Sequence, residues 1–217
     1  MQWRPNGVSS ATVDLYWIPL GAGAHVVRLN GKVYEAIKAL AERRHRCDLY
    51  HTALEISVPA GRFVIESAPI RDDRGLERGV VGAGPVGTRW LGRFRLFRYE
   101  IRLWPGGSIP DASEAVSSPL RVSNDVSIAE RIVELVSSIP MLVWGRDELR
   151  TGDMWNSNSL TSWLLARGGV ETSELQPPAG GRAPGWQAGL ALARREIQML
   201  GRYPNGWPAS RISALPS

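Results

Sequence analysis

The stretch DMWNSNSLTSWLLARGG, residues 153–169, joins hydroxyl and amide side chains to an apolar run with helical spacing. Leu160 and Leu164 lie three and seven residues after Ser157, so an α-helix would place Ser157 on the same inward stripe. Ordinary capping by Asn156 or Ser157 explains one such polar residue. A serine at a helix N-terminus is also a candidate nucleophile, because free backbone N–H groups there can hold an oxyanion.

A serine nucleophile needs a base, and the chain offers His25, His45 and His51. His51 is the best candidate because it opens the alternating segment HTALEISV, which predicts a strand. Glu55 lies about 13 Å further along that strand and is too far away to orient the histidine. Glu66, in FVIES on the returning strand, can lie opposite and is the expected orienting acid. Alternatively, His51 has only a structural role at the start of the strand and donates a hydrogen bond to a backbone carbonyl.

The segments YHTALEI, FVIES and WNSNSLTSWLL resemble the permuted NlpC-like branch of the papain-like superfamily, which includes the lecithin retinol acyltransferase-like proteins. The resemblance covers residues 48–67 and 153–167, with the look of a distinct bacterial subgroup. It implies a permuted α+β fold in which an antiparallel sheet packs against helices. It also implies His51 as the base, Glu66 as the third polar residue and Ser157 as the nucleophile, where the family has a cysteine.

The implied reaction is acyl transfer, in a serine-dependent hydrolase or acyltransferase that acts on an ester or amide. Ser157 would attack the carbonyl, His51 would take and return the proton, and Glu66 would fix the imidazole. The backbone N–H of Ser157 and the side chains of Asn156 or Asn158 are the candidate oxyanion donors. A shifted alignment would nominate Ser159 instead.

Three tryptophans are expected to form the wall of an apolar cleft for the acyl group: Trp155, Trp163 and Trp186. The chain has nine tryptophans, however, and most of them are expected in the core or over it.

Two other function classes stay open. The first is a catalytically inactive domain of the same fold that binds an acylated or anionic ligand, since serine replaces the family's cysteine. The second is a nucleic-acid-binding module or an anionic-lipid face, built on arginines that alternate with aromatic residues. These arginines are Arg89, Arg93, Arg95, Arg98 and Arg102. A solvated strand face explains them equally well.

The remaining pattern predicts the elements that position these residues. We expect a strand or loop within 13–23, a helix over 34–46 and a β-hairpin over 51–67. Strand-like alternation continues over 89–104, where a phase slip between Leu96 and Phe97 predicts a β-bulge or a strand break. A surface loop over 105–119 and three helices should follow. The first of these helices has an expected capping box of Ser127 and Glu130 and ends before Pro140, the second closes at Gly168, and the third follows the Pro-rich segment after residue 175.

Composition sets the outer limits. A chain of 217 residues with 43% apolar and 22% charged residues is expected to form one domain over 1–217. A single cysteine and no long apolar run predict a cytoplasmic protein without disulfides or a transmembrane segment. The expected partner is a small-molecule, lipid or peptide acyl substrate and not a nucleic acid, and peripheral contact with a membrane is compatible with the sequence. The net charge is +5, and 24 of the 26 basic residues are arginine. The amino-acid usage of the source organism and a basic binding surface explain this excess of arginine equally well.

Cofactor and metal sites are not expected. Gly82, Gly84 and Gly87 spell G-x-G-x-x-G, but Pro85 interrupts the motif and no helix pattern follows it. The group His45, Cys47, Asp48 and His51 has the spacing of no closed zinc site.

Overall fold

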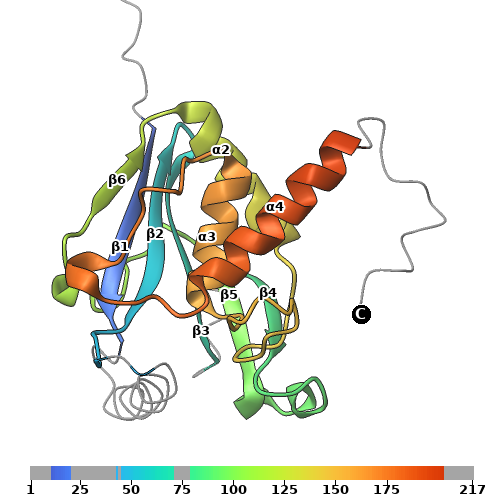
Figure 1. Cartoon of the computed structure of the whole chain (residues 1–217). Coiled ribbons are helices and arrows are strands. Elements are labelled where there is room, and N and C mark those ends of the chain that lie inside the picture. The colour runs from blue at the N-terminus through green and yellow to red at the C-terminus, as the bar shows by residue number, and fades with distance from the viewer. Residues whose placement is uncertain (1–10, 21–42, 44, 71–78, 203–217) are drawn as a thin grey trace, which may run out of the picture.

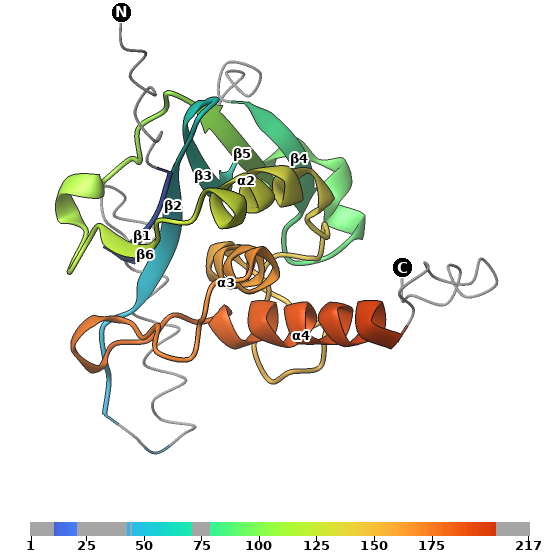
Figure 2. The ribbon, with the colours of Figure 1, turned by 90° about the horizontal axis from the view of Figure 1, so that it is seen from above.

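The computed structural model describes residues 11–20, 43, 45–70 and 79–202. Its centre is a six-stranded sheet with the order β4-β5-β3-β2-β1-β6, in which all neighbours are antiparallel. The strands are β1 (Thr12–Pro19), β2 (Tyr50–Val58), β3 (Gly61–Pro69), β4 (Val80–Pro85), β5 (Arg98–Pro105) and β6 (Leu120–Ser123). Helices α2 (Val126–Leu135), α3 (Ser157–Gly168) and α4 (Trp186–Arg202) lie on one side of it (Figures 1 and 2). The expected α+β class is confirmed.

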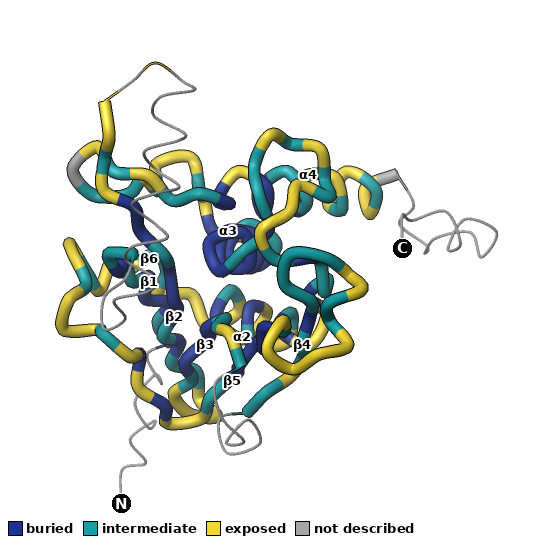
Figure 3. The backbone as a smooth tube through the Cα atoms, turned by 90° about the horizontal axis from the view of Figure 1, so that it is seen from below, coloured by how far each residue is buried: buried dark blue, intermediate teal, exposed yellow. Residues whose placement is uncertain are grey.

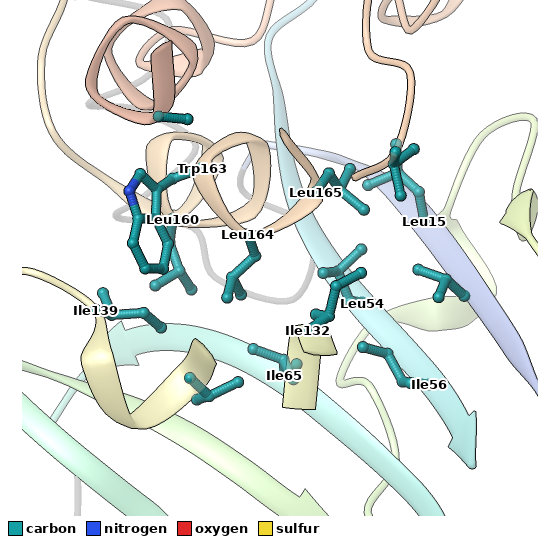
Figure 4. Packing of buried hydrophobic residues seen from close by; sticks show 14 of the residues in the cluster. Leu15, Leu54, Ile56, Ile65, Ile132, Ile139, Leu160, Trp163, Leu164 and Leu165 are labelled. Carbon is teal, nitrogen blue, oxygen red and sulfur yellow. The ribbon is translucent and has the colours of Figure 1, made fainter. Parts of the chain in front are cut away.

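The main core fills the space between the helices and one face of the sheet, which we call the helix face. On β2 it takes Leu54 and Ile56, and on α3 it takes Leu160 and Leu164 (Figure 4). Alternate residues of a strand point to opposite faces, so the apolar phase of β2 faces α3. The hairpin of β2 and β3 has the expected form, with Val58 paired to Gly61.

Helix α3 is the central helix of the fold. It lies between the sheet and α4, and most of its residues are buried (Figure 3). Its polar residues Ser157, Asn158, Ser159, Thr161 and Ser162 are buried as well, so they need partners inside the protein.

The opposite face of the sheet, which we call the far face, is crossed by the connection from β5 to β6. Ile109 of this connection packs on Ile18, Ala53 and Val64. The connection has to cross because β5 and β6 lie near opposite edges of the sheet. It contains one short 3-10 turn, Ala112–Glu114, and agrees with the expected loop.

Two local predictions were wrong. The strand expected over 89–104 begins only at Arg98, and the residues before it form two 3-10 turns, η1 (Trp90–Arg93) and η2 (Arg95–Phe97). Of the two explanations expected for the phase slip after Leu96, the structure agrees with a strand break, because β5 begins at Arg98. Helix α2 is capped by Asp125, whose carboxylate accepts the backbone N–H of Ser127 at 2.7 Å, so the expected capping box does not form. The helix expected over 34–46 falls almost wholly outside the described residues.

Candidate functional site

The Asn-Ser-Asn-Ser run at the start of α3 is largely a structural device. Asn156 is the N-cap, and its side-chain oxygen accepts the N–H of Asn158 at 2.9 Å and that of Ser159 at 3.4 Å. Ser159 completes a capping box by accepting the N–H of Asn156 at 3.1 Å. The Ser159 hydroxyl also lies 2.7 Å from the carbonyl of Gly185, just before α4.

Asn158 connects three parts of the chain. Its amide donates to the carbonyls of Tyr50 at 2.9 Å and Pro184 at 2.8 Å, and its oxygen accepts the Thr52 hydroxyl at 3.0 Å. Asn156 donates to the same Pro184 carbonyl at 2.8 Å. Both N–H groups of the Asn158 amide are therefore engaged within the fold, which argues against Asn158 as an oxyanion donor, whereas Asn156 as a donor stays a prediction.

Ser157 differs from its neighbours. Its residue is 6% exposed, yet its hydroxyl makes no hydrogen bond to any described residue. It lies on the same side of α3 as Leu160 and Leu164, one and two turns before them. A role of Ser157 as a nucleophile stays a prediction.

His51 lies on the wrong face of the sheet to serve Ser157. Thr52 contacts α3 through Asn158, so its neighbour His51 points to the far face, where the Asp111 carboxylate acts on it. Burial lowers the pKa of His51 to about 4, and Asp111 opposes this shift. The imidazole is therefore neutral at pH 7 and turned away from the helix.

Glu66 has another partner. It lies on the far face opposite Arg102 of β5, and the guanidinium of Arg102 donates to it at 2.6 Å. Arg102 also binds Glu100, with its Nε 2.6 Å from the Glu100 carboxylate, and all three residues are buried. The structure does not bring Ser157, His51 and Glu66 together, so the expected triad is not assembled.

The sequence held a signal against this triad. The β2 phase that contains Thr52, Leu54 and Ile56 is more apolar than the phase that contains His51 and Glu55. A helix with an apolar stripe packs on an apolar face, so this difference favours opposite sides of the sheet for α3 and His51 without deciding it.

The three tryptophans expected to line a cleft belong to the core. Trp155, Trp163 and Trp186 are all at most 5% exposed. Trp163 donates to Glu196 at 3.0 Å, and Trp186 packs against Trp17 with ring centroids 5.1 Å apart. They stabilise the junction of the helices with the sheet, and the prediction of a cleft wall was wrong.

The neutral His51 predicts a pH-dependent stability. Its pKa of about 4 lies below the ordinary 6.5, so the unfolded chain binds a proton that the folded chain does not. Folding free energy is therefore lost as the pH falls through 6.5, and between pH 7 and pH 5 the loss should be about 2 kcal/mol. Urea unfolding of wild type and His51→Gln over this range measures it, because only wild type should show this component. Parallel curves for the two proteins would contradict the prediction.

The glycine motif is also structural. Gly82 and Gly84 lie in β4, where a Cβ would overlap with Met141 and Tyr99 respectively. Among the described residues no group of three or more His, Cys, Asp and Glu is placed to hold a metal ion. In the same part of the chain, no helix is long and apolar enough to cross a membrane.

The surface feature that stands out is the turn between β4 and β5, residues 89–98, which we call the 89–98 turn. It contains the two 3-10 turns and extends beyond the edge of the sheet, in green at the lower right of Figure 1. Its exposed residues are Arg89, Trp90, Arg93, Phe94, Arg95, Leu96 and Phe97. Four of the five arginines singled out above belong to it, whereas Arg102 is buried on the far face and does not.

The base of the 89–98 turn is held by the segment that leads to α3. Gly87 donates its N–H to Trp144 at 2.9 Å, and Arg146 donates to the Gly87 carbonyl at 2.6 Å. Arg89 pairs with Glu148 at 3.1 Å. Within the turn, the guanidinium of Arg93 lies 4.7 Å from the Trp90 ring centroid. These contacts connect the base of the turn to the body of the protein and pack Arg93 on Trp90.

Comparison with known proteins finds no matching family model, curated protein or solved structure. The resemblance to the permuted papain-like proteins stays a prediction.

Proposed function

We propose that this protein is a binding domain that attaches to a phosphate-bearing polyanion through the 89–98 turn. The observation that carries the proposal is the charge of this exposed turn, which holds four arginines, while the chain from Gly79 to Tyr99 has no acidic residue. Guanidinium groups suit phosphate oxygens because their donors form a planar fork. The proposal is closer to the inactive, anion-binding domain considered in the sequence analysis than to an enzyme.

Two acidic residues in the described structure near the turn are each bound by an arginine. Glu100 is buried and bound by Arg102, and Glu148 is engaged by Arg89 and by the N–H of Val143 at 2.7 Å. Arg93 and Arg95 are both exposed, on either side of Phe94. A surface of one sign attracts polyanions over about 10 Å at ordinary salt.

Binding of a phosphatidylglycerol vesicle and of a single-stranded oligonucleotide tests the proposal. We expect at least one probe to bind, with an affinity that falls steeply as salt rises. Arg93→Gln/Arg95→Gln should weaken that binding at least about tenfold, since each arginine near an anionic surface contributes about 1 kcal/mol.

The matched control is Arg131→Gln/Arg194→Gln, which removes the same charge from exposed positions on α2 and α4. It should change the affinity less than about twofold, the small effect expected for charges remote from the contact. Equal losses in the two double variants, or no binding of either probe, would refute the proposal.

Acyl transfer on a permuted papain-like fold is the second candidate, favoured by the unpartnered hydroxyl of Ser157. Its base would have to be a group other than His51. Covalent labelling by a fluorophosphonate that is lost in Ser157→Ala would support it, and an unlabelled folded protein would speak against it.

A further inference from the structure

The apolar side chains of the 89–98 turn identify its partner more closely than its charge does. Trp90, Phe94 and Leu96 are 60%, 48% and 81% exposed, and Phe97 is 37% exposed. Single exposed apolar residues are ordinary, but four within eight residues on one projecting turn form a patch. Such a patch interleaved with arginines is typical of a surface that enters the headgroup layer of a membrane.

We infer that the polyanion is an anionic phospholipid bilayer, with Leu96, Phe94 and Trp90 inserted at its interface while Arg93 and Arg95 bind lipid phosphates. This inference rests on the proposed function and adds the identity of the partner to it.

Leu96 argues for lipid over nucleic acid. Proteins that hold single-stranded nucleic acid stack bases on aromatic rings, and leucine has no ring to offer. Yet Leu96 is the most exposed of the large apolar residues in the described part of the chain. Its exposure is useful where the partner is a hydrocarbon layer, which takes up aliphatic side chains as readily as aromatic ones.

The arrangement around Trp90 points the same way. One face of its ring is covered by the guanidinium of Arg93, and the ring meets Phe94 edge to face with centroids 5.8 Å apart. The ring is therefore less open to base stacking. An arginine stacked on a tryptophan joins a charged group to an apolar ring. Such a pair is stable at the boundary between lipid headgroups and acyl chains, where tryptophan is enriched.

The shape of the turn also favours insertion. Backbone hydrogen bonds from Phe94 to Leu91 at 2.9 Å and from Phe97 to Phe94 at 3.0 Å close it on itself. A closed turn exposes few backbone groups that would lose water in the interface. Its base is held to the body by the hydrogen bond from the Gly87 N–H to the Trp144 carbonyl.

The test is co-sedimentation of the full chain with phosphatidylcholine vesicles, with and without phosphatidylglycerol. Wild type should bind only the anionic vesicles. Phe94→Ser/Leu96→Ser should weaken this binding about thirtyfold, because two apolar side chains lose their transfer to the interface. The matched control Ile197→Ser/Leu200→Ser removes exposed apolar residues from α4 and should stay within about twofold of wild type. Thermal unfolding of each variant shows that it is folded.

Four outcomes would overturn the inference. The first is binding of the oligonucleotide but of no vesicle, which would leave the proposed function standing with nucleic acid as the partner. The second is a loss in the α4 control equal to that in the turn variant. The third is a wild-type dimer that dissociates in Phe94→Ser/Leu96→Ser without vesicle binding, which would assign the patch to a second copy of the chain. Failure of both the vesicles and the oligonucleotide would reject the proposed function as well.

Discussion

Replacing Arg102 with methionine is expected to lower the free energy of unfolding by about 4 kcal/mol, the usual cost of removing one partner from a buried ion pair. Arg102 is 4% exposed, and its guanidinium serves the buried carboxylates of Glu66 and Glu100 together. Without it, two carboxylates would remain unpaired on the far face of the sheet. Urea unfolding at pH 7 measures the loss through the shift of the midpoint.

Two further variants separate the ion-pair effect from a loss of packing. Arg62→Met breaks the half-exposed pair of Arg62 with Glu55 and should cost less than about 1 kcal/mol. Glu66→Gln/Glu100→Gln/Arg102→Met removes all three charges and should recover part of the stability that Arg102→Met loses. If the triple variant is less stable than Arg102→Met, the unpaired charges are not the cause.

Replacing Gly189 with alanine is expected to destabilise the protein by about 3 kcal/mol, the upper range for inserting a methyl group into a packed interior. Gly189 lies where α4 crosses α3, and a Cβ there would overlap with the carbonyl oxygen of Ser159 and the hydroxyl of Ser162. Backbone atoms cannot move aside cheaply, so the two helices would have to separate. Chemical denaturation followed by far-UV circular dichroism gives the change in free energy.

Gly201 provides the matched control on the same helix. A Cβ at this position meets nothing within 4 Å. Gly201→Ala should therefore stabilise by up to about 1 kcal/mol, because alanine has the higher helix propensity. If the two alanine variants have the same stability, close packing at the helix crossing is not what requires glycine at position 189.

Predictions that rest on local periodicity were largely confirmed. The alternation of residues 51–58 defines both the hairpin and the two faces of β2, and the spacing of apolar residues in 157–168 defines α3. These patterns are reliable because a side chain's face depends only on the backbone geometry of its own segment. Helix α2 is capped by Asp125 rather than Ser127. Aspartate and serine are almost equally good N-cap residues, so the local sequence does not decide between two neighbouring candidates.

The prediction of a strand over residues 89–97 was wrong because a strand depends on a neighbouring segment as well as on its own sequence. Apolar and basic residues alternate there as they do in a strand, but a strand also needs a partner to take its hydrogen bonds. Strand β4 pairs with β5 only as far as Arg98, so the preceding residues close on themselves in 3-10 turns. Their exposed apolar side chains become visible as a patch only once the fold has left them outside.

The amino-acid sequence by itself determined the hairpin of β2 and β3, the three helices after residue 125, a capped start of α3 at Asn156 or Ser157, and the concentration of arginine in residues 89–98. Only the tertiary structure decided which residues meet. Helix α3 covers the face of β2 that bears Thr52, so Ser157 and His51 lie on opposite sides of the sheet. Glu66 pairs with Arg102, 36 residues away, because strand register brings that guanidinium opposite it and a buried carboxylate must be compensated by the nearest positive charge. Such pairings depend on how the layers stack, which no local pattern specifies.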